Sequence, residues 1–536
     1  MRKSIRSLAV LMLFVALAVS ALASAYNAKP KLVVVIVIDQ FRGDMLERHY
    51  DELSPNGFRT LLDHGAWFKN CYYNYANTET GPGHATIGTG SYTLGHGIMA
   101  NQWYDPARGR FVTSVQDDNA KVLGADVAGP SASPHNLQTD TIGDELKLAT
   151  GGRAKVFGIS LKDRAAVLPV GYSANAAYWI DYQSGAWITS TYYMTDAPAW
   201  VTAFNEAGSR AKYLGREWKA SDGKVLRSTA QEDGKPKPFF ELVGPTPFAN
   251  DYTIDFARAL IENEKLGQGP VTDLLSISFS SNDILGHKVG PDSVEEREMV
   301  LSLDRQIGGF LQYLKAKFGA DNLIVALTAD HGVAPLPDYA KKLRIPASNL
   351  NIRDYAPQLN EMLASKLGKE GKYVVSFDYP KAFLNPNAFA AAGVGEAEAE
   401  RTVGDMMMQF GIRGYVTKSQ LAANEVPDTV FSQQLRNSYS PLPSWYVFGF
   451  ASPFVIASTS GTSHGQPYSY DAHVPLVLYG NPFKAGSYYQ HAEPVDLAVT
   501  LSAVLGINKP ASAVGRPLWE AISVEQPKPA ARAAVR

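Results

Sequence analysis

The sequence predicts an α/β fold, in which a central, mostly parallel sheet is flanked by helices on both faces. Short apolar runs rich in valine, isoleucine and leucine recur along the 536 residues, and runs of this length are typical of strands buried on both faces. Helical patterns, such as that of residues 293–318, lie between them. This alternation indicates a sheet covered by helices. The length allows one large domain with insertions, or two to three units.

Five apolar runs are the expected strands, and side chains capable of chemistry directly follow four of them. In chain order the runs are "KLVVVIVID" ending at Asp39, "KVFGISLKDR" ending at Arg164, "DLLSISFSSND" ending at Asp283, "NLIVALTADHG" ending at Gly332, and "VPLVLYG" ending at Gly480. The side chains that follow the first four runs are Asp39, Lys162, Arg164, Asp283, Asp330 and His331. Because open α/β sheets bind ligands beyond the carboxyl ends of their strands, we expect these groups to meet at one edge.

Two regions are expected to be insertions into one large domain that spans residues 26–523. Residues 170–255, approximately, are rich in tyrosine, tryptophan, serine and glycine and lack a clean periodicity. Residues 336–455, approximately, combine strand-like "KYVVSFD" and "RGYVTKS" with a helical pattern at "GEAEAERTVGDMMMQF", which predicts a small α+β cap subdomain. The last residues, 524–536, have the composition of a loose tail.

The N-terminus has the three parts of a secretory signal peptide. A basic start is followed by the apolar stretch 8–23 and by the small residues Ala23-Ser24-Ala25, so we expect cleavage after Ala25 and a signal peptide of residues 1–25. An uncleaved membrane anchor is the alternative, but the run is short for a spanning helix. The mature protein is therefore expected to be exported and soluble, without stable membrane anchoring.

Charge and cysteine content narrow the classes of function. The formal net charge is −2 from 50 basic and 52 acidic residues. Loss of the three basic residues of the signal peptide leaves 47 − 52 = −5, so composition gives a nucleic-acid-binding surface no support. Cys71 is the single cysteine, which excludes an intramolecular disulfide and a multi-cysteine metal site. We expect Cys71 to be a buried small residue, and an exported protein without disulfides fits a bacterial periplasm.

Aspartate and histidine residues form the strongest candidate metal site. Asp283 and His287 are four residues apart, which places both on one face of a helix. Asp330 and His331 are adjacent after a strand, and Asp39 ends the first strand. The sixth candidate is His464, in the glycine-containing loop "SGTSHGQPY", and its rival is His473 in "YDAHVP". Three carboxylates and three imidazoles suit one or two divalent ions, zinc above all, with manganese or iron as alternatives.

The stretch "TETGPGHA" places a hydroxyl on a tight turn. Gly81, Pro82 and Gly83 allow the turn, and "HATIGTG" has the pattern of a helix start. The free N–H groups of a helix N-terminus form a natural anion site, so Thr80 is expected beside a bound oxyanion. A threonine hydroxyl needs a base or a metal ion to become a nucleophile. The alternative is that Thr80 only caps the helix. We expect His84 to be structural or to support a metal ligand.

Motifs from the first strand to the last strand strengthen this hypothesis. They are "VIDQFRGD", "TGPGHATIGTG", "NDILGH", "TADHG" and "SHGQPYSYDAHVPLVLYG". In these segments the sequence resembles the alkaline phosphatase superfamily of two-metal phosphohydrolases. Through "ANQWYD" and "SLKDRAAVL" it resembles, more narrowly, the phosphate-irrepressible alkaline phosphatases exported by some Gram-negative bacteria. The sulfatase branch is not favoured, because "CYYNY" around Cys71 lacks the proline and arginine of that branch's motif.

The resemblance implies a role for each candidate residue and one catalytic domain over residues 26–523. Thr80 is the nucleophile that becomes phosphorylated. Two Zn²⁺ per chain are implied, and the ligands of the first are Asp39, Asp330, His331 and the oxygen of Thr80. The ligands of the second are Asp283, His287 and His464. The side chains that contact the non-bridging phosphoryl oxygens are Asn101, Lys162 and Arg164.

Lys162 and Arg164 bear on the class of substrate. A phosphate monoester carries two negative charges and three free oxygens, whereas a diester carries one charge and a second organic group. Together with Asn101, the two cations favour small-molecule monoesters, and a broad specificity is expected because recognition centres on the phosphoryl group. The alternatives are a phosphodiesterase or phosphonate hydrolase on the same fold, and an exported phosphate- or metal-binding protein without turnover. No feature of the sequence indicates an obligate protein partner.

Overall fold

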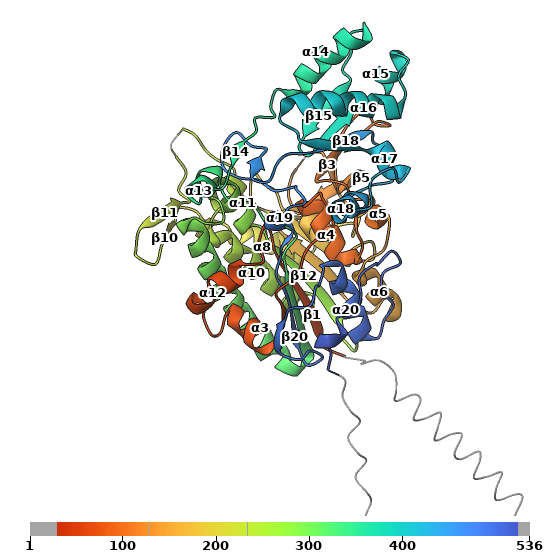
Figure 1. Cartoon of the computed structure of the whole chain (residues 1–536). Coiled ribbons are helices and arrows are strands. Elements are labelled where there is room, and N and C mark those ends of the chain that lie inside the picture. The colour runs from red at the N-terminus through yellow and green to blue at the C-terminus, as the bar shows by residue number, and fades with distance from the viewer. Residues whose placement is uncertain (1–28, 128, 233, 524–536) are drawn as a thin grey trace, which may run out of the picture.

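The computed structural model describes residues 29–127, 129–232 and 234–523. The predicted signal peptide and the predicted tail of residues 524–536 lie outside the described residues. The expected fold class is confirmed, because a large α/β sheet is flanked by helices on both faces (Figure 1). Among the described residues, no helix combines the length and the apolar character needed to span a bilayer.

The main sheet has eleven strands in the order β21-β2-β20-β13-β1-β12-β7-β8-β9-β5-β6. In this order their bounds are Gly486–Tyr488, Ala66–Phe68, Leu476–Gly480, Leu323–Thr328, Leu32–Ile38, Asp273–Phe279, Val156–Ser160, Ala176–Ile180, Trp187–Ser190, Gln116–Leu123 and Pro130–Ala132. The five predicted runs are β1, β7, β12, β13 and β20. The sheet is parallel in its middle, whereas β20, β9, β5 and β6 pair antiparallel, so it is mixed rather than parallel throughout.

The central strand β1 ends at the same edge of the sheet as its neighbours β12 and β13, where the candidate site lies. Every residue of β1 is buried, as expected for a β-branched run between two covering layers. Ile38 pairs with Phe279 of β12, and Val37 pairs with Thr328 of β13, both in parallel. The residues that follow these strands, among them Asp39 and Asp330, therefore leave the sheet at the same edge.

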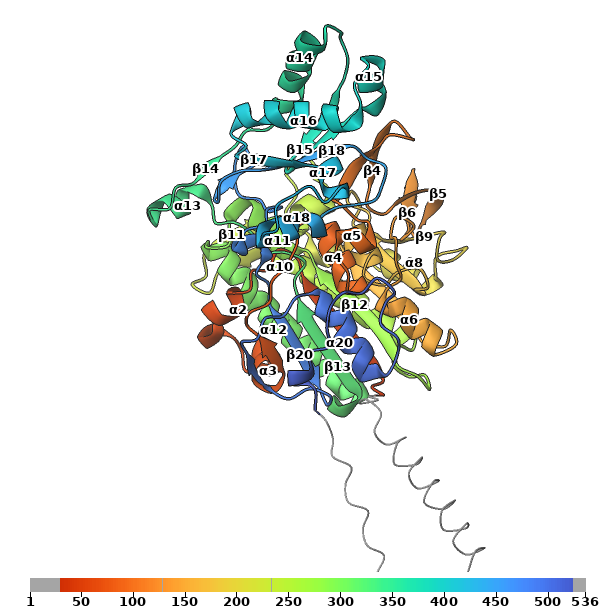
Figure 2. The ribbon, with the colours of Figure 1, turned by 45° about the vertical axis from the view of Figure 1, so that its right-hand side comes forward.

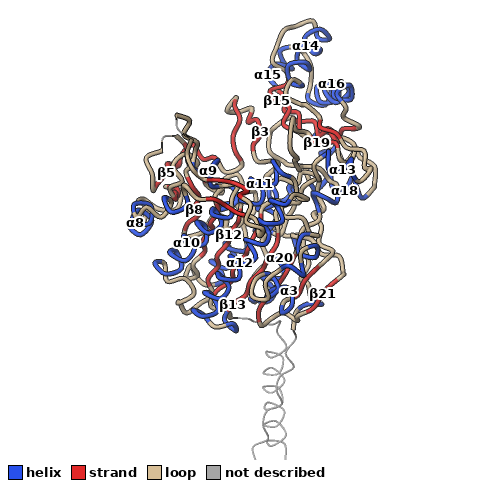
Figure 3. The backbone as a smooth tube through the Cα atoms, turned by 90° about the vertical axis from the view of Figure 1, so that its left-hand side faces the viewer, coloured by secondary structure: helices blue, strands red, loops and turns tan. Residues whose placement is uncertain are grey.

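Helices cover both faces of the sheet, which Figure 3 shows spread across the view from β5 to β21. On one face the helices are α4 (Thr80–Thr89), α6 (Ile142–Ala149), α7 (Asp163–Val167) and α20 (Val495–Leu505). On the other face they are α3 (Phe58–His64), α8 (Ala199–Glu206), α9 (Phe239–Val243), α10 (Pro247–Asn263), α11 (Ser281–Val289) and α12 (Val294–Phe318). The helix expected over residues 293–318 is α12, which begins after Ser293 because the Ser293 hydroxyl accepts a hydrogen bond from Glu296 N.

Residues 336–455 form a second layer of structure beyond the sheet edge (Figure 2). A four-stranded sheet runs in the order β15 (Val374–Asp378), β16 (Lys381–Leu384), β18 (Tyr446–Phe450) and β17 (Gly414–Thr417). Its helices are α13 (Pro337–Lys342), α14 (Tyr355–Leu367), α15 (Pro386–Ala391), α16 (Glu396–Met407), α17 (Lys418–Ala422) and α18 (Val430–Asn437). Sixteen buried apolar residues of this segment form a cluster of their own, whereas its Phe383 and Tyr446 belong to the main core. We call residues 336–455 the inserted segment.

Residues 170–255 differ in kind from the inserted segment. They supply β8 and β9 to the main sheet, as well as α8, α9 and a small hairpin of β10 (Glu217–Lys219) and β11 (Val225–Ser228). The remaining short elements are α2 (Met45–Arg48), α5 (Thr93–His96), α19 (Ser469–Ala472), the hairpin of β3 (Gln102–Asp105) and β4 (Arg110–Thr113), and the pair β14 (Ser348–Asn349) and β19 (Val455–Ile456).

Candidate active site

Three ligand atoms converge where β1 and β13 end. Asp39 Oδ1 and Asp330 Oδ2 each lie 3.6 Å from His331 Nε2. All three side chains are fully buried, and none of these three atoms has a hydrogen-bond partner among the residues that the structure describes. Zinc bonds of about 2.0–2.2 Å to nitrogen and oxygen place tetrahedral ligands about 3.3–3.6 Å apart. The donor set and these two distances therefore fit one divalent ion, and Asp283 also offers a ligand atom within 4.8 Å of one each from Asp39 and His331.

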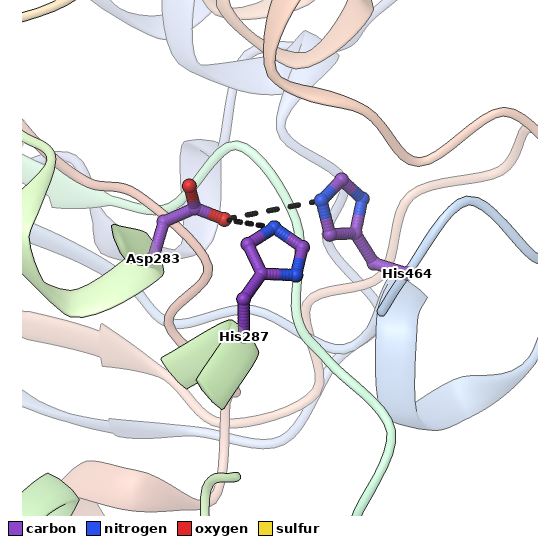
Figure 4. Close-up of side chains that lie close together, drawn as sticks. All are labelled: Asp283, His287 and His464. Atoms are coloured by element: carbon purple, nitrogen blue, oxygen red, sulfur yellow. Dashed lines mark ion pairs between the residues drawn. The ribbon is translucent and has the colours of Figure 1, made fainter. Parts of the chain in front are cut away.

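A second group of ligand atoms comes from Asp283, His287 and His464 (Figure 4). Asp283 and His287 are on one face of α11, as their spacing predicted, and His287 Nε2 is 3.1 Å from Asp283 Oδ1. His464 comes from the loop before α19, and its Nε2 is 3.9 Å from the same oxygen. The His464 ring also stacks on the His331 ring, at a centroid distance of 3.7 Å. These three residues fit a second divalent ion.

Main-chain carbonyls orient all three of these histidines. In each ring Nδ1 lies within hydrogen-bond distance of a carbonyl oxygen: His287 of Thr462 O at 3.0 Å, His331 of Gly332 O at 2.9 Å, and His464 of Thr78 O at 2.7 Å. A carbonyl can only accept, so Nδ1 carries the proton and Nε2 of the neutral ring presents its lone pair. This is the arrangement by which proteins fix the tautomer of metal-binding histidines.

Lys162 lies between the two groups. Its Nζ donates to Asp39 Oδ2 at 2.6 Å and to Asp283 Oδ2 at 2.5 Å. Burial lowers the pKa of the Lys162 ammonium, but the two carboxylates outweigh burial and hold it above its usual value. The two carboxylates therefore favour the charged form of Lys162 between the two ligand groups.

The carboxylates of the site repel one another. Burial and the neighbouring Asp330 carboxylate raise the pKa of Asp39 well above its usual value, despite Lys162. Burial also acts to raise the pKa of Asp283, but Lys162 and His287 hold it well below its usual value. One lysine does not balance three buried carboxylates, so the site has an excess of negative charge that divalent cations would neutralise.

Thr80 is the first residue of α4. The N-cap residue is Glu79, so the alternative that Thr80 caps this helix is wrong. The helix begins four residues before His84, and Gly81-Pro82-Gly83 form its first turn rather than a turn that precedes it. Proline is well tolerated in a first turn, where its missing N–H has no helical partner. Thr80 thus lies at the positive end of a helix.

The first turn of α4 packs against the Asp330 main chain. A Cβ atom at Gly83 would lie 2.3 Å from Asp330 O, so only glycine permits this approach. Nδ1 of His84 lies 2.9 Å from Thr80 O and 3.3 Å from Asp330 Oδ2, and its Nε2 accepts from Ser278 Oγ at 2.8 Å. His84 therefore ties the nucleophile candidate to the first ligand group, which is a structural role.

Asn101 and Arg164 line one cavity of 610 Å³ beside the first turn of α4. Asn101 Oδ1 accepts a hydrogen bond from Gly81 N at 2.7 Å, which leaves the two N–H bonds of Nδ2 for another acceptor. Arg164 is the second residue of α7, and the N-cap of this helix is Lys162. The structure thus brings together Thr80, the six ligand candidates and the three phosphate-contact candidates at one edge of the sheet.

A family model described as type I phosphodiesterase / nucleotide pyrophosphatase matches residues 33–464, from β1 to the last ligand candidate. The chain belongs to this family. Alkaline phosphatase PhoV of Synechococcus elongatus is 33% identical over 517 residues, which cover 91% of this chain and 92% of PhoV. A protein of Myroides odoratus named a calcium-transporting ATPase is 37% identical over 530 residues, 94% of this chain and 96% of that protein.

Solved structures of alkaline phosphatase PafA have the same fold as this phosphodiesterase-family chain. The wild-type crystal structure matches with a TM-score of 0.83 and 30% identity, over 92% of this chain and 99% of PafA. A PafA variant with substitutions of one threonine, one asparagine, one lysine and one arginine matches with a TM-score of 0.84 and 29% identity, over the same shares of the two chains. With PhoV, these likenesses confirm the predicted membership of the alkaline phosphatase superfamily.

His473, the rival of His464, lies apart from the ligand groups of this family member. Its Nε2 donates to Lys69 O at 2.9 Å, and its ring stacks on Tyr72 at a centroid distance of 4.5 Å. The Nε2 lone pair is therefore not available to a metal ion in this tautomer. Cys71 is buried, as expected.

Three residues at the site were missed in the sequence. Gln40 donates from its main chain to Asp330 Oδ1 at 3.0 Å and from Nε2 to Asp283 Oδ1 at 2.7 Å, and its position after Asp39 was a usable signal. Glu79, which lines the cavity with Asn101, was equally visible as the neighbour of Thr80. Lys381 reaches Glu79 from β16, and no local pattern marks it.

Proposed function

We propose that this chain is an exported alkaline phosphatase that hydrolyses small-molecule phosphate monoesters with broad specificity. The proposed nucleophile is Thr80, which becomes a phosphothreonine, and the proposed cofactors are two Zn²⁺ per chain. PhoV and PafA, both named alkaline phosphatases, support the activity. The residue types substituted in the PafA variant are also those proposed here for Thr80, Asn101, Lys162 and Arg164.

The two ligand groups would hold the metal ions. Asp39, Asp330 and His331, with the Thr80 oxygen, would bind one ion, and the second would be bound by Asp283, His287 and His464. When bound, two divalent ions supply charge stabilisation at the attacking and leaving oxygens of a phosphoryl transfer. The unpartnered Asp39 Oδ1, Asp330 Oδ2 and His331 Nε2 support this assignment.

The chain's own groups address the remaining oxygens. A phosphoryl transition state spreads charge over its equatorial oxygens and needs positioning more than covalent help. Asn101 Nδ2 and the Arg164 guanidinium, which line the same cavity, would donate to these oxygens, and Arg164 can do so with two N–H groups. The α4 N-terminus adds a positive dipole behind Thr80.

One observation carries the choice of a monoester. Lys162 Nζ lies between the two ligand groups, 2.6 Å from Asp39 Oδ2 and 2.5 Å from Asp283 Oδ2. A bound pair of metal ions would compete with Lys162 for these carboxylates, and the ammonium would then be free to turn to a third phosphoryl oxygen. A third cation is of most use to a dianionic monoester, because a diester has an organic group in place of one free oxygen.

Phosphodiester hydrolysis is the second candidate function, since the matching family model bears that description. The test is a comparison of p-nitrophenyl phosphate with bis-p-nitrophenyl phosphate for Lys162→Ala and Arg164→Ala. Each charged hydrogen bond is worth about 1.5–3 kcal/mol, or about 10- to 150-fold, and we expect this loss in kcat/KM for the monoester and a much smaller one for the diester. Equal losses on both substrates would contradict the proposed roles. ATP should be assayed as a further substrate, because one relative is named a calcium-transporting ATPase.

We also propose that the protein is periplasmic, with residues 1–25 as a cleaved signal peptide. The single Cys71 and the apolar stretch after a basic N-terminus support this. Residues 26–523 would form one catalytic domain that includes insertions at about 170–255 and 336–455.

A further inference from the structure

The inserted segment reaches the candidate active site through one buried lysine. Lys381 is the first residue of β16, and its side chain is 1% exposed. Its Nζ donates to Met99 O at 2.9 Å and lies 3.7 Å from Glu79 Oε1. A lysine is rarely buried to this degree unless it is paired, so these contacts are the reason for its position.

Glu79 connects Lys381 to Asn101, the proposed phosphate-contact residue. Its Oε2 accepts a hydrogen bond from Asn101 N at 2.9 Å. Asn101 Oδ1 in turn accepts from Gly81 N at 2.7 Å, in the first turn of α4. Lys381, Glu79 and Asn101 therefore form a continuous chain of polar contacts that ends one residue after Thr80.

The same segment binds both ends of the loop that contains Asn101. Ser440 Oγ donates to Gly97 O at 2.7 Å, and Ser444 Oγ donates to Tyr104 O at 2.8 Å. Lys381 holds the middle of this loop through Met99 O. The inserted segment therefore holds the main chain from 97 to 104 in place. The direction in which Asn101 presents Nδ2 depends on these contacts.

Charge gives Lys381 a second effect. Glu79 carries a carboxylate into the cavity that Asn101 and Arg164 line, where it would repel a phosphate dianion. The Lys381 ammonium offsets that charge at 3.7 Å. In a buried setting, removal of one partner of such a pair leaves an uncompensated charge.

We propose that Lys381 is a positioning residue for the phosphoryl group, so that the inserted segment completes the site instead of only covering it. Lys381 holds Glu79 and the 97–104 loop, which orients Asn101 toward the non-bridging oxygens. This inference rests on the proposed function for its substrate, a phosphate monoester or inorganic phosphate.

A double-mutant cycle tests the inference on the zinc-loaded, full-length protein. The four proteins are wild type, Lys381→Met, Asn101→Ala and the double variant, and the two readouts are kcat/KM for p-nitrophenyl phosphate and the Kd of inorganic phosphate. In the wild-type background we expect Lys381→Met to lower kcat/KM about tenfold and to raise the phosphate Kd about tenfold. In the Asn101→Ala background we expect less than about a twofold change in each, because the effects of coupled residues are not additive. Equal losses in both backgrounds would overturn the inference.

Lys418→Met is the matched control. Lys418 is also a buried lysine of the inserted segment, and its Nζ donates to Leu442 O at 2.7 Å and Ser444 O at 2.8 Å. Because Ser444 also binds Tyr104, Lys418→Met tests the docking of the segment without the contact to Glu79. It should lower the melting temperature and change the phosphate Kd far less than Lys381→Met does, and an equal effect on that Kd would reduce Lys381 to a general docking contact. If Lys381→Met does not fold, Glu79→Gln/Lys381→Met removes both charges, and its phosphate Kd is compared in the two Asn101 backgrounds.

The phosphate readout separates this inference from the proposed function. A wild type that turns over no monoester but binds phosphate would contradict the proposed enzyme, and the cycle in Kd would still decide the role of Lys381. A wild type that hydrolyses the monoester, with additive losses in the cycle, would leave the enzyme intact and contradict only the positioning role.

Discussion

His464 and His473 differ in what their Nε2 atoms can do. Nε2 of His464 faces Asp283 with its lone pair, whereas Nε2 of His473 is bound to the Lys69 carbonyl. We predict that His464→Ala lowers the zinc content from two to about one ion per chain, because one of three protein ligands is lost. Atomic emission on the dialysed protein measures this content directly.

His473→Ala is the control for this prediction. It should retain both ions, because His473 lies outside the two ligand groups. A variant of His464 that keeps two tightly bound ions, or a loss of one ion in the His473 variant, would reverse the assignment of the sixth ligand.

At the scale of residues, the sequence predicted the site residues whose positions are determined by the end of a strand or by helical spacing. Asp39, Asp283 and Asp330 follow buried strands, and a parallel register brings such positions together. It could not reveal Lys381, because the contact of Lys381 with Glu79 depends on how two distant parts of the chain dock. It also gave the wrong start for α4, since a Gly-Pro-Gly sequence is read as a turn unless tertiary packing holds it in a helix.

At the scale of elements, the close approach of α4 to Asp330 is the feature most sensitive to change. Gly83→Ala would raise intrinsic helix propensity by about 1 kcal/mol, but the added Cβ would lie 2.3 Å from Asp330 O. The helix must move away, and we predict a loss of about 100-fold in kcat/KM, since a displacement of about 1 Å has such an effect. Steady-state kinetics at saturating zinc measure the loss.

Gly309 in α12 provides the comparison. A Cβ there would meet no heavy atom within 4 Å, so Gly309→Ala should stabilise the protein by about 1 kcal/mol and leave kcat/KM unchanged. A Gly83 variant that is as active as the Gly309 variant would show that α4 does not need this approach.

Glu400 of α16 predicts a dependence of stability on pH. Its side chain is buried, and burial raises its pKa from 4.5 to about 7, despite the hydrogen bond that Oε2 accepts from Ser419 N. Between these two values the unfolded chain loses the proton first, so the free energy of unfolding falls as pH rises through 4.5 to 7. The loss is about 3 kcal/mol at most.

Glu400→Gln should remove this contribution. Relative to wild type, the variant should gain stability at pH 8 and show no gain at pH 4, as measured by urea unfolding at a series of pH values. A difference between the two proteins that stays constant from pH 4 to pH 8 would contradict the raised pKa.

Elements were easier to predict than their pairing. The apolar runs gave the positions of β1, β7, β12, β13 and β20, because burial on both faces demands such composition. The antiparallel direction of β20 was not visible, since direction depends on the path of the connection and not on the strand's residues. The strands β8 and β9 lie in a region without clean periodicity, and their place in the main sheet comes from tertiary packing.

At the scale of the whole molecule, two structural units meet at the proposed phosphate site (Figures 1 and 2). The main sheet, with its helices and loops, carries Thr80 and the ligand candidates, and the inserted segment supplies Lys381. Asp378 of β15 lines the same cavity as Asn101 and Arg164, so the inserted segment also contributes to the wall of the site. Activity should therefore depend on docking between the two units as well as on the ligands.

The most direct test of the central claim is the rate of hydrolysis of p-nitrophenyl phosphate and of bis-p-nitrophenyl phosphate. Wild type and Thr80→Ala are each measured after zinc loading and after removal of metal with a chelator. The account predicts a monoester rate far above the diester rate, lost both without metal and in Thr80→Ala. A preference for the diester, or a Thr80→Ala enzyme as fast as wild type, would contradict it.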